Sequence, residues 1–227
     1  MLDRIGFQAR DGHEVSGELA LPAGDARRPG LVVVHEWWGI NDDIRRLARR
    51  FADEGFVTLA VDLYGGVSTS DGAEAMRLST ELSTAAAMEI IAGAVATLAA
   101  HPRCTAMVGV TGFCLGGAMA LVAACNVDGL AAAVPFYGTG KDEFLDFTRA
   151  KAPILGHYAK NDAFVKAERV EELRGRAVAA GARFEVCLYD AGHAFMRAGD
   201  PAAYDKASAE LAWERTMRFL RLELGAS

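Results

Sequence analysis

The chain has 227 residues, of which 52% are hydrophobic, and it carries a formal net charge of −6 at pH 7. This length suits one open α/β domain with a sizeable core. The acidic balance argues against a nucleic acid partner, because a surface that binds phosphates needs a basic patch.

The cysteines and the N-terminus indicate a protein of a reducing compartment. The spacing of Cys104, Cys114, Cys125 and Cys187 fits neither a CxxC pair nor a zinc cluster, and a disulfide framework is not expected. The first residues contain no apolar signal segment, and no stretch has the length and apolarity of a membrane span. We therefore expect a cytoplasmic protein without a membrane partner. The sequence has no nucleotide-binding fingerprint, so no cofactor and no metal are expected.

The predicted elements alternate along the chain. Two segments around an Asp-Gly turn, Ile5–Arg10 and Glu14–Leu21, predict a short antiparallel hairpin. Apolar runs then predict strands buried on both faces, at Gly30–His35, Phe56–Asp62, Met107–Gly112, Leu130–Tyr137, Pro153–Tyr158 and Arg183–Tyr189. Helical stretches follow them, at Asp43–Glu54, Ala73–Ala100, Leu115–Asn126, Asp142–Arg149, Lys166–Ala180 and Pro201–Leu222. This order predicts a single domain over residues 1–227, with a mostly parallel sheet and helices on both faces.

The strongest local signal is the segment Gly112–Gly117, which reads Gly-Phe-Cys-Leu-Gly-Gly between a predicted strand and a predicted helix. This is the pattern of a nucleophile elbow with Cys114 as the nucleophile. Glycines allow the close approach that such a sharp turn needs. The start of the helix offers free N–H groups, including that of Leu115, to a developing oxyanion. The alternative is a glycine-rich turn around a buried, inert cysteine.

A thiol nucleophile needs a base, and the base needs a group that orients it. In α/β-hydrolases the order along the chain is nucleophile, acid, histidine. Asp162 and His193 occur in this order, each directly after a predicted strand. Taken singly, they also fit a turn aspartate and a loop histidine. Because the carboxyl ends of parallel strands meet at one edge, we predict a triad of Cys114, His193 and Asp162.

The first buried strand ends in His35-Glu36-Trp37-Trp38. Glu36 is expected to point into the same pocket and to be able to take the thiol proton; the alternative is a surface carboxylate. The N–H of Trp37 is the expected second oxyanion donor. We expect the walls of the pocket to include Trp37, Trp38, Tyr137 and Phe195.

Together these motifs resemble the dienelactone hydrolase family (carboxymethylenebutenolidases) over almost the whole chain. The resemblance rests on His35–Asn41, Val61–Tyr64, Gly112–Gly117, Asn161–Val165 and Ala191–Phe195. It implies an α/β-hydrolase fold without a large cap domain. It also implies that Glu36 contacts the resting thiol and helps to deprotonate it.

The resemblance further implies arginines that bind a carboxylate of the substrate. Arg197, four residues after His193, matches one such position. A second arginine is expected after the Asp-Leu-Tyr strand end, where the segment is shorter here and Arg77 is the candidate.

The expected function is therefore hydrolysis of a small, carboxylate-bearing ester or lactone through an acyl-enzyme. A general carboxylesterase or thioesterase with the same triad is the first alternative, and a non-catalytic small-molecule receptor is the second. A redox sensor would need a resolving cysteine near Cys114. The expected oligomeric state is a monomer or a small homo-oligomer.

Overall fold

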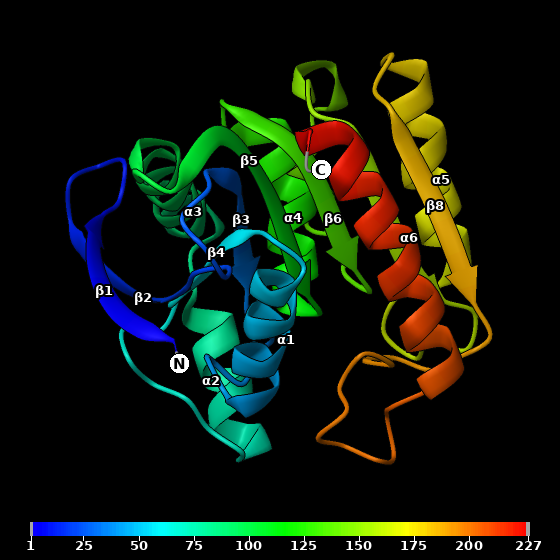
Figure 1. Ribbon diagram of the computed structural model, residues 1–227. Helices are drawn as coiled ribbons and strands as arrows, with labels where there is room; N and C mark the ends of the chain where they lie inside the picture. Colours follow the sequence, from blue (N-terminus) through cyan, green and yellow to red (C-terminus); the bar gives the residue numbers. More distant parts are fainter. Residues whose placement is uncertain (1, 226–227) are drawn as a thin grey trace.

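A computed structural model describes residues 2–225 and shows one twisted sheet with helices on both faces (Figure 1). The sheet has eight strands in the order β1-β2-β4-β3-β5-β6-β7-β8. They are β1 (Asp3–Gln8), β2 (Glu14–Ala20), β3 (Arg28–Val34), β4 (Val57–Val61), β5 (Cys104–Phe113), β6 (Leu130–Phe136), β7 (Ile154–Ala159) and β8 (Phe184–Tyr189). The β1-β2 and β2-β4 pairs are antiparallel and the other pairs are parallel. The predicted fold class is confirmed, including its N-terminal hairpin.

The helices divide between the two faces. They are α1 (Asp42–Asp53), α2 (Gly72–Glu81), α3 (Thr84–Ala100), α4 (Leu115–Asn126), α5 (Ala167–Ala179) and α6 (Lys206–Leu224). Residues of α3, α4 and α5 pack with Val32 and Val34 on one face, and residues of α1 and α6 pack with Leu31 and Val33 on the other. Successive residues of β3 thus alternate between two cores, which explains why the strand is apolar from Leu31 to Val34.

Three predicted helices differ from the structure by more than one residue at an end. The stretch predicted as Ala73–Ala100 is two helices, because the Ser83 side chain accepts the Ala86 N–H and starts a new helix there. The stretch predicted as Asp142–Arg149 forms only two short 3-10 turns, η1 (Asp142–Phe144) and η2 (Phe147–Arg149). In the second turn Asp146 accepts the Thr148 N–H at 3.1 Å, a local bond that competes with helix formation.

The last helix begins later than predicted. It starts at Lys206 because Asp205 is its N-cap and accepts the Ser208 N–H at 2.8 Å. Within residues 2–225, no helix taken singly is long and apolar enough to cross a membrane, while α2 and α3, which meet at 84°, pass that test only as a pair.

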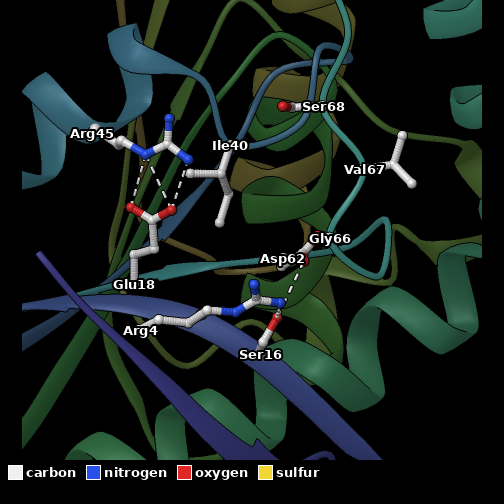
Figure 2. A pocket seen from close by; sticks show the side chains of 10 residues that line it. Arg4, Ser16, Glu18, Ile40, Arg45, Asp62, Gly66, Val67 and Ser68 are labelled. Carbon is white, nitrogen blue, oxygen red and sulfur yellow. Dashed lines mark hydrogen bonds and ion pairs between the residues drawn. The ribbon is translucent and has the colours of Figure 1, made fainter.

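The hairpin is joined to the rest of the sheet by a polar network around a cavity of about 90 Å³ (Figure 2). Arg45 of α1 donates to both carboxylate oxygens of Glu18 on β2, at 2.8 to 3.1 Å. Arg4 of β1 donates to Ser16 at 3.3 Å, and the Ser16 hydroxyl donates to Asp62 at 3.2 Å. These contacts hold the hairpin against α1 and the end of β4, two elements that flank the loop after β3.

Candidate active site

The side chains predicted to be functional follow the carboxyl ends of neighbouring parallel strands. Glu36 follows β3, Cys114 follows β5, Tyr137 follows β6, Asp162 follows β7 and His193 follows β8. A cavity of about 540 Å³ opens where these strands end. It is lined by Glu36, Trp37, Trp38, Met76, Cys114, Leu115, Ala118, Tyr137, Gly138, Thr139, Gly140, Phe164, Val165, His193, Ala194, Arg197 and Ala203.

Cys114 lies at the turn between β5 and α4 in a strained conformation, with φ of 56° and ψ of −112°. A Cβ atom at Gly112 would lie 2.1 Å from the Gly116 carbonyl oxygen, and one at Gly116 would lie 2.3 Å from that of Val34. Both glycines are therefore needed for strand and helix to approach this closely. The turn places the half-buried sulfur in the cavity wall.

Three side chains form a continuous hydrogen-bonded chain. His193 Nε2 lies 3.2 Å from Cys114 Sγ, and His193 Nδ1 lies 2.8 Å from Asp162 Oδ2. The other oxygen of Asp162 accepts the backbone N–H groups of Phe164 and Val165 at 2.8 and 3.0 Å. These two bonds fix the carboxylate so that Oδ2 faces the imidazole. The arrangement can move a proton between the sulfur and the imidazole while the carboxylate orients the ring.

The surroundings of His193 favour its charged form. Burial opposes the imidazolium, but hydrogen bonds to Asp162 and Cys114 outweigh it and raise the pKa of His193 to about 9. Burial of Asp162 is likewise outweighed, and its bonds to His193 and to backbone N–H groups hold the pKa of that carboxyl below its ordinary value. An imidazolium beside the sulfur stabilises a thiolate, which is the nucleophilic form of cysteine.

Glu36 belongs to a second, looser polar group. Its side chain is buried; Oε1 accepts the Tyr137 hydroxyl at 3.4 Å, and Oε2 lies 3.7 Å from Arg197 Nη1. Within residues 2–225, Oε2 accepts no hydrogen bond. Burial raises the pKa of Glu36 to about 7, although Arg197 and His193 oppose this. The contact of Glu36 with the resting thiol stays a prediction, because the sulfur bonds to His193 here.

The two predicted oxyanion donors lie on the wall beside Cys114. Leu115 is the first residue of α4, so its N–H has no acceptor within the helix. Trp37 lies in the loop after β3 and also lines the cavity. Gly116 brings the start of α4 against the Val34 and His35 carbonyls, so the two N–H groups come from adjoining segments.

Two of the residues predicted to bind substrate do not line the cavity. Arg77 does not line the cavity, because it lies exposed on α2 and pairs with Glu74 and Glu81 along the helix. Phe195 is fully buried and does not line the cavity either. Its ring packs beneath the site, with its centroid 5.3 Å from that of Tyr137. Trp38 and Tyr137 do line the cavity, as expected.

Two apolar residues that line the cavity, Phe164 and Met76, were not predicted from the sequence. Phe164 is 78% exposed, and its ring centroid lies 4.9 Å from that of His193. Its place two residues after Asp162 was the available signal, since its N–H binds that carboxylate. Met76 is 56% exposed on α2, and its approach to the cavity depends on how α2 packs, which no local pattern indicates.

Histidine, cysteine and acidic side chains are the groups that could bind a metal ion, and cysteines are also the groups that could form a disulfide. Within residues 2–225, no group of three or more of them is arranged to hold a metal ion. The four cysteines are free thiols, and Cys104 and Cys125 are buried in the core. Burial raises the pKa of both thiols, which disfavours their reactive form.

Comparison with known proteins identifies the family of the chain. The dienelactone hydrolase family matches residues 15–224. The chain is 32% identical over 221 residues to Protein usf of Aquifex pyrophilus, covering 93% of this chain and 95% of that one. It is also 32% identical over 232 residues to the carboxymethylenebutenolidase of Pseudomonas sp. strain P51, covering 97% and 95%. A solved structure named m3DLH superposes with a TM-score of 0.86 at 27% identity, covering 100% of this chain and 99% of that one. The chain therefore belongs to the dienelactone hydrolase family.

Proposed function

We propose that the chain is one α/β-hydrolase domain that hydrolyses small esters or lactones with Cys114 as nucleophile, His193 as proton carrier and Asp162 as its orienting group. The observation that carries the proposal is the chain of contacts from Asp162 through His193 to Cys114, at 2.8 and 3.2 Å. The family and the carboxymethylenebutenolidase relative support a substrate of the ester or lactone class.

The proposed reaction has two halves. The Cys114 thiolate attacks the carbonyl carbon, a C–S bond forms, and the carbonyl electron pair moves onto oxygen. The Leu115 and Trp37 N–H groups stabilise that oxyanion, a contribution of about 3 kcal/mol for each such donor. The C–O bond then breaks, and the His193 imidazolium protonates the leaving oxygen. In the second half, His193 takes a proton from water, the hydroxide attacks the thioester, and the thiolate leaves.

Replacement of the nucleophile tests the proposal. Cys114→Ala is expected to reduce the turnover of 4-nitrophenyl acetate by about a thousandfold or more, because the covalent route is lost. Cys187→Ala is the matched control, since it removes a half-buried thiol of β8 that does not line the cavity. Mass spectrometry of the quenched wild type should find one acetyl group on Cys114. Wild-type turnover in purified Cys114→Ala would contradict the assignment.

A substrate panel separates this proposal from its alternatives. The same triad also suits general esters and acyl thioesters, and the mostly apolar cavity wall, with Trp37, Trp38, Leu115 and Phe164, is compatible with both. Wild type should therefore be assayed with a lactone, a 4-nitrophenyl ester and an acyl thioester. Binding of all three without turnover would identify a receptor and contradict the hydrolase.

A further inference from the structure

The guanidinium of Arg197 contacts three other side chains of the protein in the absence of substrate. Its Nη2 donates to Asp200, its Nη1 lies 3.7 Å from Glu36, and its central carbon lies 5.4 Å from the ring centroid of Trp38. Only 19% of the side chain is exposed. Arg197 is thus a partly buried cation that faces two carboxylates and an indole ring.

Asp200 is held in place by the turn that carries it. Its N–H donates to the Arg197 carbonyl at 3.0 Å, and its Oδ1 accepts the Ala202 N–H at 3.1 Å. The preceding Gly199 donates to Asp43 of α1 at 2.9 Å, and a Cβ atom at this glycine would lie 2.6 Å from that carboxylate. The turn therefore already orders the Asp200 side chain, so its carboxylate loses little conformational freedom when it pairs with Arg197.

The charge around the cavity is unfavourable for a further anion. Apart from His193, Arg197 is the only basic residue among those that line the cavity in the described part of the chain. Arg77, the candidate for a second cation, pairs with two glutamates of its own helix. A substrate carboxylate would be the third carboxylate on one guanidinium and would have to displace Asp200. Like charges placed together in this way cost binding free energy.

The remaining surface of the cavity is suited to an uncharged substrate. Its walls are mostly apolar, and two apolar side chains at the wall, Met76 and Phe164, are 56% and 78% exposed. Burial of apolar substrate surface against such side chains supplies affinity in proportion to the area removed from water.

We propose that Asp200 is a specificity-determining residue, which neutralises Arg197 so that the cavity selects neutral lactones and esters over those that carry a carboxylate. This inference rests on the proposed function for its reaction but names a narrower substrate class. In it, Arg197 is a positioning residue for Glu36 and Trp38 instead of a carboxylate clamp.

The test compares two lactones that differ by the carboxylate, namely dienelactone and the same ring without it, 5-methylene-2(5H)-furanone. Wild type is expected to show a kcat/KM for the neutral lactone at least about tenfold higher. Asp200→Asn removes the charge but keeps an oxygen for the Ala202 N–H. It should shift the ratio about tenfold towards the carboxylate-bearing lactone, mainly through KM.

Two further variants separate the local effect of Asp200 on Arg197 from a change in overall charge. Asp190→Asn removes the same charge from the loop after β8, where the carboxylate accepts from Asn161 and does not contact Arg197. It should leave the ratio of the two lactones unchanged. Adding Arg197→Gln to Asp200→Asn should cancel the shift, because the freed guanidinium is then absent.

The possible outcomes separate this inference from the proposed function. A wild type that prefers the carboxylate-bearing lactone, or an unchanged ratio in Asp200→Asn, overturns the role of Asp200 and leaves the hydrolase standing. Failure of the wild type to hydrolyse either lactone or 4-nitrophenyl acetate overturns both. A ratio that shifts equally in Asp190→Asn attributes the effect to overall charge and also overturns the inference.

Discussion

The chain from Asp162 through His193 to Cys114 and the group around Glu36 both follow strand ends at one cavity, but they are bonded very differently. In the first, the contacts to the imidazole are 2.8 and 3.2 Å, and the second oxygen of Asp162 accepts two backbone N–H groups. In the second, the contacts of Glu36 are 3.4 and 3.7 Å, and one of its oxygens accepts no hydrogen bond within residues 2–225.

The difference shows two ways of setting the charge of a buried group. Short, complete hydrogen bonding holds Asp162 ionised and raises the pKa of His193 to about 9, so an ion pair persists at neutral pH. Incomplete bonding leaves desolvation dominant at Glu36 and raises its pKa to about 7, so its charge changes in the neutral range. We expect the first group to carry the reaction and the second to tune it.

The largest effect is expected from breaking the short chain. Asp162→Asn should lower kcat for 4-nitrophenyl acetate about a thousandfold, because an amide does not stabilise the imidazolium or fix its tautomer. The pKa of His193 should fall from about 9 towards its ordinary value, which NMR titration of the ring would measure. Asp190→Asn is the control. A loss below about tenfold would show that Asp162 does not serve His193.

The pH dependence of the free energy of unfolding should reveal the ionisation of Glu36 in the second group. Between pH 4.5 and about 7 the unfolded state releases the Glu36 proton while the folded state keeps it, so ionisation makes folding less favourable as pH rises. Glu36→Gln should therefore gain about 2–3 kcal/mol in free energy of unfolding relative to wild type between pH 5 and pH 8. Urea titrations at the two pH values measure this gain. A constant difference would mean that Glu36 is ionised throughout.

Kinetics of the same variant sharpen the comparison further. Because the sulfur bonds to His193 and the oxygens of Glu36 face Tyr137 and Arg197, Glu36→Gln should reduce kcat/KM only about tenfold at pH 8. It should also remove an inflection of the wild-type profile near pH 7, while the fall above about pH 9 from deprotonation of His193 remains. A loss as large as that of Asp162→Asn would make Glu36 the acceptor of the thiol proton.

The smallest effect is expected outside the cavity. Arg77→Ala removes exposed pairs with Glu74 and Glu81 and should leave the free energy of unfolding almost unchanged, because water screens ion pairs at the surface. Kinetics with either lactone should not change. A raised KM confined to the carboxylate-bearing lactone would place Arg77 at the substrate after all.

Local requirements made part of this site predictable. The elbow around Cys114 could be found from sequence because the spacing of its glycines is a local pattern, although Gly116 is required by a contact with the distant Val34 carbonyl on β3. Parallel strands, in addition, bring their carboxyl ends to one edge. The order of Cys114, Asp162 and His193 after three strands was therefore enough to predict that they meet. The hairpin was predicted from its Asp-Gly turn, and the mostly parallel sheet from apolar runs that alternate with helical stretches.

Contacts between distant segments decided the rest. Phe195 and Phe164 are both aromatic residues beside triad members, yet one is fully buried and the other 78% exposed, because the packing beneath Tyr137 encloses only the first. The family resemblance predicted that Arg197 binds a substrate carboxylate, but only the folded turn brings Asp200 and Glu36 to the same guanidinium. The sequence by itself determined which reactive groups the protein has and where the chain turns. The tertiary structure decided how those groups are charged, because burial and the number of partners, which set each pKa, depend on segments far apart in the chain.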